Sequence, residues 1–299
     1  MRPIYKTLFA ISAALIVIAA VFLSLWGLRL GVDFKGGSVM EVMFPKGSVE
    51  SSEAIKVLQG TNIPALKDAT ANSAGNNALI IKSGTLTEDE HQKALAVLKV
   101  IAPNKEIQEK RFDSVGPLIS SELKKDSITA IVIVLLAISI YIALVFRKLR
   151  GLLPMWVMAL AVIGALIHDL IIPMGVFAWL GYVKGVEINA IFVAALLTVL
   201  GYSISDTVVV FDRVRENLIK IGSREPLGEV VHKSVMQTLV RSLNTNLTTL
   251  LSLVAIYVFG GESVRYFALA LIIGIFLGAF SSISVASPIL VWGARKRRA

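Results

Sequence analysis

Six long apolar runs dominate this chain of 299 residues and limit what it can fold into. Each run is close to or above the ~17–25 residues that a helix needs to span the hydrocarbon core of a bilayer. The sequence therefore predicts six transmembrane helices. The runs lie at about 8–28, 128–146, 152–172, 188–211, 243–259 and 266–292.

The composition favours a polytopic α-helical membrane protein and excludes several kinds of site. Only 17% of the residues are charged, whereas soluble domains carry about 25%. Cysteine is absent, which excludes disulfides, thiol catalysis and thiolate metal sites. The three histidines, His91, His168 and His232, are too scattered along the sequence to predict a zinc site.

Lys and Arg residues lie mostly on one side of the predicted helices. Fifteen of them fall in one set of segments, and the short opposite loops hold only Lys184 and Arg265. Because cytoplasmic loops are enriched in Lys and Arg, we expect both termini in the cytoplasm and residues 29–127 outside it. The net charge of +9 then has anionic membrane lipids, not nucleic acid, as its natural partner. The fifteen residues are Arg2, Lys6, Arg147, Lys148, Arg150, Arg213, Arg215, Lys220, Arg224, Lys233, Arg241, Arg295, Lys296, Arg297 and Arg298.

The segment 29–127 differs in pattern from the apolar runs and predicts an α+β domain between the first two helices. Its strand-like and helix-like stretches follow the order β-α-β-β-α-β, which is that of a ferredoxin-like split βαβ unit. Ser48 is expected to cap the first helix, and Thr87 forms a capping-box pair with Glu90 at the second. The predicted strands are 39–44, 65–70, 78–82 and 105–112, and the predicted helices are 48–60 and 87–101.

Three parts of the chain are therefore expected. Residues 1–28 form a cytoplasmic N-terminus and the first span, residues 29–127 form the outer domain, and residues 128–299 form the other five spans. The third part includes a cytoplasmic loop at 212–241 and a basic cytoplasmic C-terminus. An amphipathic pattern at 226–239 indicates a short helix in this loop, which either lies at the membrane surface or only connects two spans.

Asp206 is the strongest single indication of chemistry. It lies within the fourth apolar run, about 9 Å along the helix from the next acidic residue, Asp212. A charged Asp at the centre of a membrane helix costs about 2.5–3.5 kcal/mol. Desolvation favours its protonated form, so Asp206 is a candidate for proton uptake and release. The alternative is a structural Asp bonded to Tyr202 or to nearby hydroxyls.

Arg241 is the candidate partner of Asp206 and precedes the fifth apolar run. Thr245, Thr248 and Ser252 follow it on the same helical face, at i+4, i+7 and i+11. This stripe of hydroxyls below a cation is consistent with a hydrated path through the membrane. The alternative, which spacing alone leaves equally open, is an Arg that snorkels to the surface, with hydroxyls bonded to their own backbone.

Other sequence features carry weaker predictions. His168 and Asp169 interrupt the third run just before Pro173, about 24 Å along the helix and close to its outer end, which favours a structural role. Gly274 and Gly278 form a small-xxx-small pattern that predicts close helix packing. The segment "GVDFKGG" at 31–37 lacks the ending of a phosphate loop and predicts a glycine-rich turn into the first strand.

Three classes of function remain from these residues. The first is a proton-coupled membrane machine whose outer domain moves. The second is an intramembrane aspartyl protease, which requires two carboxylates at one depth to share a proton; Asp169 and Asp206 are expected at different depths. The third is a scaffold in which Asp206 is dispensable. The first class fits best.

Several motifs together resemble the SecD/SecF family of bacterial protein-export membrane proteins. They run in order through the chain over about residues 31–290. The matching segments are "GVDFKGG" (31–37), "SVGPLISSEL" (114–123), "GYSISDTVVVFDRVREN" (201–217), "RSLNTNLTTLL" (241–251) and "GAFSSISVASPIL" (278–290).

The resemblance implies a function and a fold. It implies one six-helix half of an RND-superfamily pair whose other half is SecD, in the bacterial cytoplasmic membrane. Such a pair works beside the SecYEG channel and its motor SecA, and it uses the proton-motive force to draw unfolded preprotein across the membrane late in translocation. The alternative is half of a proton-driven RND-type exporter of lipids or small molecules, against which the small outer domain argues.

The resemblance also implies which residues carry protons. The family's proton-pathway positions correspond to Asp206 and Arg241 here, with Thr245 and Thr248 as supporting candidates on the same face. Asp212 and Arg213 correspond to a cytoplasmic cap on the path. No catalytic residue, metal or cofactor is expected, since protons are the coupling ion.

Overall fold

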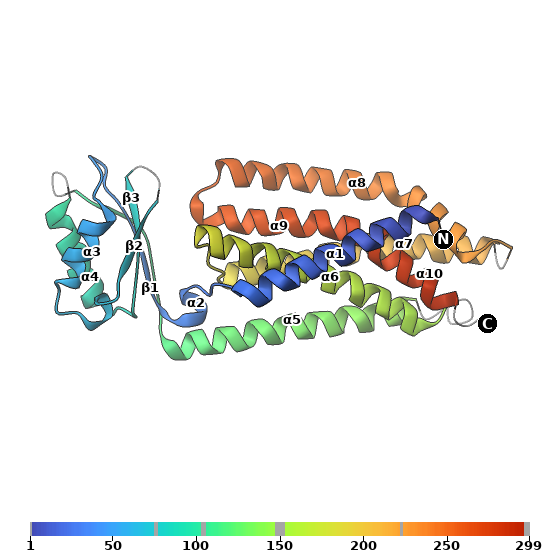
Figure 1. Cartoon of the computed structure of the whole chain (residues 1–299), viewed down its shortest axis with the longest axis horizontal. Coiled ribbons are helices and arrows are strands. Elements are labelled where there is room, and N and C mark those ends of the chain that lie inside the picture. The colour runs from blue at the N-terminus through green and yellow to red at the C-terminus, as the bar shows by residue number, and fades with distance from the viewer. Residues whose placement is uncertain (1, 75–76, 103–105, 147–152, 222–223, 296–299) are drawn as a thin grey trace. The chain divides into compact units, whose positions relative to one another are not determined.

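Two structural units make up the chain in the computed structural model (Figure 1). One unit is Leu30–Ser127, and the other combines Met1–Arg29 with Ile128–Ala299. The structure describes residues 2–74, 77–102, 106–146, 153–221 and 224–295.

The unit Leu30–Ser127 contains a four-stranded sheet with the order β2-β3-β1-β4, in which every neighbouring pair is antiparallel. Its elements follow the predicted order β-α-β-β-α-β, and α3 and α4 cover one face of the sheet (Figure 1). The strands are β1 (Gly37–Met43), β2 (Thr70–Ser73), β3 (Ala78–Ser83) and β4 (Gln108–Val115). The helices are α2 (Val32–Lys35), α3 (Ser51–Gln59), the 3₁₀ turn η1 (Pro64–Leu66) and α4 (Glu88–Ile101).

Alternation along the strands builds the core of this unit. Side chains two residues apart on a strand share one face, so Met40 and Val42 of β1 both point inward with Ile81 of β3. They pack with Leu58 of α3 and Leu98 of α4, all of them almost fully buried. The unit therefore has a hydrophobic core of its own.

Helix starts in this unit match the sequence prediction in one case and differ in another. The capping box is present: the Glu90 N–H donates to Thr87 Oγ1, and the Thr87 N–H donates to Glu90 Oε2 at 2.9 Å. The prediction of Ser48 as a cap is wrong, because α3 begins only after Glu50. Val49 is buried in the core, and its packing keeps the residues before the helix extended.

The second strand also begins later than predicted. Residues 65–70 were expected to form it, but η1 occupies Pro64–Leu66 and β2 starts at Thr70. The side chain of Leu66 is fully buried, so the turn places it in the core before the strand begins.

Six spans in the described part of the chain are long and apolar enough to cross a membrane, which confirms the predicted number. Five of them are single helices. The sixth combines two helices with a π-helical turn between them. The spans are α1 (Pro3–Trp26), α5 (Pro117–Val145), α6 (Met155–Lys184), α7 (Ala190–Ile221), α8 (Leu227–Phe259), and α9 (Glu262–Ser281) with η4 (Ser282–Ala286) and α10 (Ser287–Arg295).

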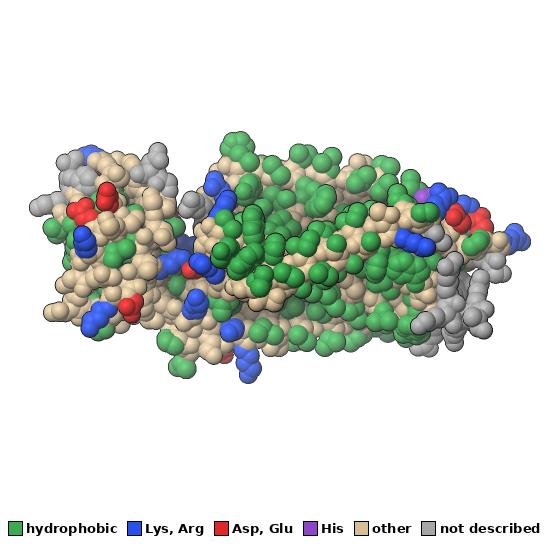
Figure 2. Space-filling model, viewed as in Figure 1, with side chains coloured by type: hydrophobic (Ala, Val, Ile, Leu, Met, Phe, Trp, Pro, Cys, Tyr) green, Lys and Arg blue, Asp and Glu red, His purple; other side chains and the backbone are tan. Residues whose placement is uncertain are grey.

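The interior of the bundle is formed by α6, α7 and the sixth span. In the most apolar stretches of α6 and the sixth span, 56% and 61% of the residues are buried, against 6% in α5 and 11% in α1. Hydrophobic side chains cover the face of the bundle seen in Figure 2, and charged side chains gather near the turn between α7 and α8. An apolar surface bounded by charges fits a polytopic membrane protein.

Glycines allow the closest helix contacts. A Cβ on Gly274 of α9 would overlap the side chain of Val199 in α7, and one on Gly278 would lie 3.0 Å from Cβ of Ser203. The predicted small-xxx-small pattern therefore packs α9 on α7. Gly175 serves the same purpose between α6 and Ala19 of α1.

Helix α6 runs farther than the third apolar run predicted. It continues past residue 172 to Lys184, with Pro173 inside it. Proline is tolerated in transmembrane helices because neighbouring helices and side chains satisfy the freed backbone groups. His168 and Asp169 therefore lie near the middle of α6, and the prediction that they lie close to its outer end is wrong.

The segment 212–241 is also more helical than predicted. α7 continues to Ile221 and α8 begins at Leu227, so the amphipathic stretch 226–239 is the first part of α8. The side-chain amide of Asn217 donates to Ser234 Oγ at 2.8 Å and to Gln237 Oε1 at 2.9 Å. These bonds pair the two helices beyond their apolar runs, and the amphipathic pattern at 226–239 does not show which residues of α7 it would face.

Candidate functional site

Asp206 lies in the middle of α7 and is bound by an amide from α8. Only 7% of its surface is exposed. Asn246 Nδ2 donates to Asp206 Oδ2 at 2.6 Å and to the carbonyl oxygen of Ser242 at 2.7 Å. An amide N–H can bond to a carboxylate without supplying a charge, so a neutral group holds Asp206 in this arrangement.

Arg241 and Asp206 do not form an ion pair in the structure. Arg241 is exposed on α8, and its guanidinium has no hydrogen-bond or ion-pair partner among the described residues. It precedes Asn246 by five residues, which places it about 7.5 Å away along the helix axis. Asp206 and Arg241 thus lie on the adjacent helices α7 and α8, but the residue that contacts the Asp206 carboxylate is Asn246.

The hydroxyl stripe of α8 bonds to its own helix. Thr245 Oγ1 donates to the carbonyl oxygen of Arg241 at 3.0 Å, and Thr248 Oγ1 donates to that of Thr245 at 2.9 Å. Ser252 Oγ likewise donates to Thr248 O at 3.3 Å. This is the second of the two alternatives that spacing left open. Thr245 and Thr248 lie on an exposed face and do not contact Asp206.

Tyr202 also bonds elsewhere than to Asp206. Its hydroxyl lies 2.6 Å from Thr249 Oγ1 and donates to the carbonyl oxygen of Thr245 at 3.2 Å. The alternative in which Tyr202 binds the Asp206 carboxylate is therefore not the arrangement in the structure. Tyr202, Asp206 and Asn217 each bind α8, at successive levels along α7.

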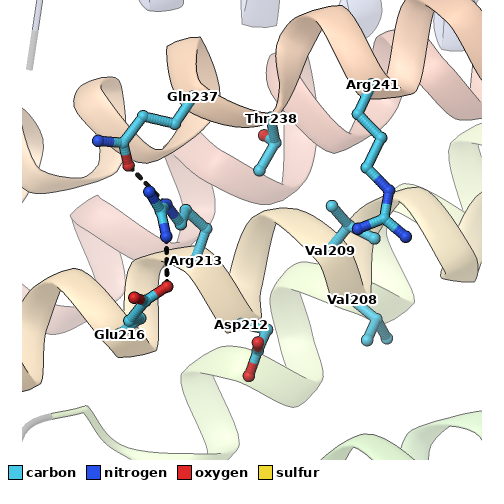
Figure 3. Close-up of a pocket in the computed structure, with 8 residues that line it drawn as sticks. All are labelled: Val208, Val209, Asp212, Arg213, Glu216, Gln237, Thr238 and Arg241. Carbon is cyan, nitrogen blue, oxygen red and sulfur yellow. Dashed lines mark hydrogen bonds and ion pairs between the residues drawn. The ribbon is translucent and has the colours of Figure 1, made fainter.

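A cavity of about 400 Å³ opens between α7 and α8 beside Arg241 (Figure 3). Arg213 points toward α8, where it donates to Gln237 Oε1 at 2.7 Å and bonds to Glu216 of its own helix. Asp212 pairs with Arg215 at 3.0 Å. Asp212 and Arg213 thus both line this cavity, but they bind different partners. The lining residues are Val208, Val209, Asp212, Arg213, Glu216, Gln237, Thr238 and Arg241.

A second buried carboxylate, Asp169 of α6, lies in a polar cluster formed by three helices. His168 Nδ1 lies 2.8 Å from Asp169 Oδ1. Ser203 of α7 and Ser281 of α9 both donate to Asp169 Oδ2, the latter at 2.7 Å. Neither His168 nor Asp169 has exposed surface. The cluster is thus sealed within the bundle.

The two buried carboxylates bind separate sets of side chains. Asp169 is occupied by His168 and two serines, and Asp206 by Asn246. Carboxylates of an aspartyl protease must face each other to share one proton, so this arrangement does not support a protease. Within the described residues, no group of three or more His, Asp or Glu side chains could hold a metal ion.

Asn246, Ser203 and Ser281 were not predicted from the sequence. Each is an uncharged polar residue in an apolar run, where many such residues only bond to their own backbone. The signal that was available is the amide of Asn246, which is larger and more costly to bury than a hydroxyl. Which carboxylate it would reach depends on how α7 packs against α8.

Family models match most of the chain. The model of "Protein export membrane protein SecD/SecF, C-terminal" matches residues 96–296, and that of the "SecD/SecF GG Motif" matches residues 27–44. The chain belongs to the SecD/SecF family.

The GG motif of the SecD/SecF family forms the predicted turn into β1. Gly36 and Gly37 have φ angles of 78° and 121°, which residues other than glycine rarely adopt. A Cβ on Gly37 would lie 2.6 Å from the carbonyl oxygen of Ser83 in β3. The two glycines are therefore required for the chain to enter the sheet.

Relatives in the SecD/SecF family resemble this chain over most of its length. The protein translocase subunit SecF of Thermobaculum terrenum is 39% identical, and the match covers 95% of this chain and 90% of the relative. That of Anaerolinea thermophila is 37% identical with the same coverage. The protein translocase subunit SecDF of Brucella abortus is 35% identical over all of this chain and 37% of its own length.

A solved structure of the family has the same fold. The crystal structure of SecDF, a translocon-associated membrane protein from Thermus thermophilus, superposes with a TM-score of 0.82 at 31% identity. The match covers 97% of this chain and 38% of that longer one. The architecture derived above is therefore that of one part of SecDF.

Proposed function

We propose that this chain is the SecF-type subunit of a preprotein translocase and uses the proton-motive force, together with a SecD-type partner, to promote late steps of export. Membership of the SecD/SecF family makes it a protein-export membrane protein. Proton coupling, the partner proteins and the site residues are the proposed part.

The buried Asp206–Asn246 pair is the observation that carries proton coupling. Asp206 lies in an apolar bundle with 7% of its surface exposed, and a neutral amide is its only hydrogen-bond partner among the described residues. A carboxylate buried without a counter-charge is stabilised by taking up a proton. Such residues inside membranes mark proton and ion pathways.

Arg241 supplies the second state in the proposed cycle. Its guanidinium is free of ion pairs among the described residues and borders the cavity between α7 and α8. A shift of α8 along α7 by about 7.5 Å, the rise of five helical residues, would bring Arg241 to the level of Asn246. Arg241 would then favour release of the proton from Asp206 by pairing with the carboxylate.

The energy available to this cycle is sufficient for a helix shift. Each charge that crosses the membrane yields about 2.3 kcal/mol per 100 mV. For each charge, this bias changes the population ratio of two conformations by a factor that rises with the membrane potential, from severalfold to about fiftyfold at 100 mV. The motion would pass through the bundle to the unit Leu30–Ser127.

A SecD-type partner is proposed from the longer relatives. This chain corresponds to 37% of the SecDF of Brucella abortus and to 38% of the solved SecDF chain. Those proteins carry a SecD portion in the same chain, which this chain would obtain from a separate subunit. SecYEG, SecA and an unfolded preprotein are the further partners that the family resemblance implies.

The proposed setting is the bacterial cytoplasmic membrane. The Lys and Arg distribution supports cytoplasmic termini and an outer position for the unit Leu30–Ser127. We further propose that this unit is a ferredoxin-like domain, because its strand order β2-β3-β1-β4 and antiparallel pairing follow the split βαβ pattern.

The test is gradient-dependent translocation by Asp206→Asn in membrane vesicles that carry the chain with its SecD partner. Loss of the gradient-dependent component, with normal amounts of the assembled complex, supports the proposal. Ser205→Ala is the matched control, since Ser205 is exposed and lies next to Asp206 on α7. Translocation by Asp206→Asn at the wild-type rate would mean that Asp206 is structural and would remove the basis for proton coupling here.

A further inference from the structure

We infer that His168 is a second proton-binding residue of the bundle, with Asp169 as the positioning residue that balances its charge. Nothing in the proposed Asp206–Arg241 cycle uses this pair. Only the role of the bound proton in transport rests on the proposed function; the binding itself does not.

The bonds around Asp169 determine which nitrogen of His168 carries hydrogen. Asp169 Oδ2 accepts from the hydroxyls of Ser203 and Ser281, and Asp169 Oδ1 faces His168 Nδ1 at 2.8 Å. These three bonds suit an ionised carboxylate, which only accepts hydrogen bonds. With Asp169 ionised, Nδ1 is the donor, and in the neutral imidazole the lone pair lies on Nε2.

His168 Nε2 is the open position of this cluster. The residue has no exposed surface, and no donor or acceptor of the described residues bonds to Nε2. Buried polar atoms without a partner are rare in proteins and often have a functional reason. A proton is the smallest ligand that such a nitrogen takes, and histidine binds one in the physiological pH range.

The proposed step balances in charge and atoms. A proton delivered from water forms an N–H bond at Nε2, and no bond within the protein breaks. The pair changes from a net charge of −1, neutral imidazole with carboxylate, to a net charge of 0, imidazolium with carboxylate. Because a net charge is costly to bury, the Asp169 carboxylate is the group that balances the imidazolium.

Few other ionisable groups face this cluster. Helix α6 packs against α1, α7, α9, η4 and α10. Asp206 is the nearest acidic residue of α7, Tyr202 bonds toward α8, and η4 carries no ionisable residue. Phe280 of α9 lies 6.4 Å from the His168 ring and adds an apolar wall. The other ionisable residues of these helices whose side chains the structure describes are Tyr5 and Lys6 of α1, Tyr182 and Lys184 of α6, Asp212, Arg213, Arg215, Glu216 and Lys220 of α7, and Arg265 and Tyr266 of α9.

Helix α7 connects this site with Asp206. Ser203, which binds Asp169, precedes Asp206 by three residues, so the two side chains lie within one turn of α7. Ser281, the other hydroxyl on Asp169, ends α9 directly before the π-helical turn η4. Such turns recur at functional sites. Protonation at His168 is therefore placed to act on α7 and on the sixth span together.

The experiment is nitrogen NMR of protein labelled with ¹⁵N-histidine in lipid nanodiscs, titrated from about pH 9 to about pH 5. The three histidines give three pairs of ring-nitrogen signals, one from Nδ1 and one from Nε2 of each, and His168→Asn assigns one pair. We expect the His168 signal to change reversibly from the Nδ1–H tautomer to imidazolium. A signal that stays neutral throughout, or that shows the Nε2–H tautomer, would overturn the inference.

Asp169→Asn tests the positioning role in the same spectra. We expect the His168 titration to move to lower pH, because the counter-charge is lost, while the signals of His91 and His232 stay unchanged. An unchanged His168 titration would exclude Asp169 as the balancing group. Where this variant does not fold, Ser281→Ala provides the second test, since it removes one of the donors that keep Asp169 ionised, and we expect a smaller change in the same titration.

Translocation assays separate this inference from the proposed function. His168→Asn keeps an N–H donor near Asp169 but has no nitrogen that binds a proton, and we expect about a tenfold loss of gradient-dependent translocation. Wild-type translocation by His168→Asn alongside a defective Asp206→Asn would leave the proposed function intact and remove His168 from the proton path. Wild-type translocation by Asp206→Asn, with a His168 signal that titrates, would remove the basis for the proposed function and leave proton binding at His168 intact.

Discussion

Asn246 of α8 donates to Asp206 of α7 across 2.6 Å, while its own Oδ1 is buried and has no partner among the described residues. A protonated carboxylic acid can donate a hydrogen bond, whereas a carboxylate can only accept one. The amide of Asn246 carries both a donor and an acceptor. It can therefore bond to Asp206 in either protonation state, once by nitrogen and once by oxygen.

Replacement of Asn246 by leucine is expected to impair proton coupling. The variant removes the donor to Asp206, and a hydrogen bond to a charged group contributes about 1.5–3 kcal/mol. Asp206 then loses its hydrogen-bond partner among the described residues, and we expect gradient-dependent translocation to fall at least tenfold. Asn244→Leu is the control, since Asn244 is exposed on the same helix. Equal rates for the two variants would contradict a role for the amide.

Replacement of Arg241 by glutamine is expected to lower translocation activity without lowering the stability of the protein. Arg241 forms no ion pair among the described residues, and exposed substitutions of this kind usually change stability by less than about 0.5 kcal/mol. We expect normal thermal unfolding in detergent but loss of gradient-dependent translocation. Unfolding at a temperature lowered by several degrees would indicate a structural role for Arg241 instead.

Enlargement of Gly274 is expected to destabilise the bundle. A Cβ at this position would overlap Val199, so Gly274→Ala forces α9 away from α7. Overpacking of this kind costs about 1–3 kcal/mol, which thermal unfolding of the purified protein measures. Gly201→Ala on α7 is the control, because no atom lies within 4 Å of its Cβ position. A larger loss in the control would refute the proposed packing.

Acid is expected to loosen the start of α4 through Glu90. The N–H and hydroxyl of Thr87 donate to the Glu90 carboxylate and hold its pKa below the ordinary value of 4.5. A lowered pKa stabilises the folded state above pH 4.5, and this contribution is lost as the pH falls through the lowered value. The protection of the α4 amides against hydrogen exchange, relative to their intrinsic exchange rates, should therefore fall below that pH in the whole protein.

Two variants check the assignment to Glu90. Glu90→Gln keeps a side-chain acceptor but does not titrate, so the acid-dependent part of the exchange at the start of α4 should disappear. Thr87→Ala removes the cap and is expected to cost about 1 kcal/mol at neutral pH. Wild-type acid dependence in Glu90→Gln would assign the effect to another carboxyl group of the same turn, such as Glu88, whose pKa is lowered by the hydrogen bond from Gln92.

The helices and strands could be predicted largely from local patterns. Length and hydrophobicity determine which segments span a membrane, and these gave the number of spans. Two residue pairs could also be predicted, because the members of each lie within one or two helical turns of each other. These are the capping pair Thr87 and Glu90 and the small pair Gly274 and Gly278. The ends of α6 and α7 could not be predicted, because Pro173 and the polar residues after Asp212 are tolerated only where neighbouring helices satisfy them.

The sequence by itself determined that this protein spans a membrane six times, which acids lie in apolar runs, and which family's motifs it carries. These follow from the high cost of placing polar groups in lipid and from the spacing of residues along the chain. Only the tertiary structure decided that Asp206 binds Asn246 and that Asp169 joins His168 with serines of two other helices. The choice of partner depends on the rotation and register of packed helices, which periodicity along one helix does not specify.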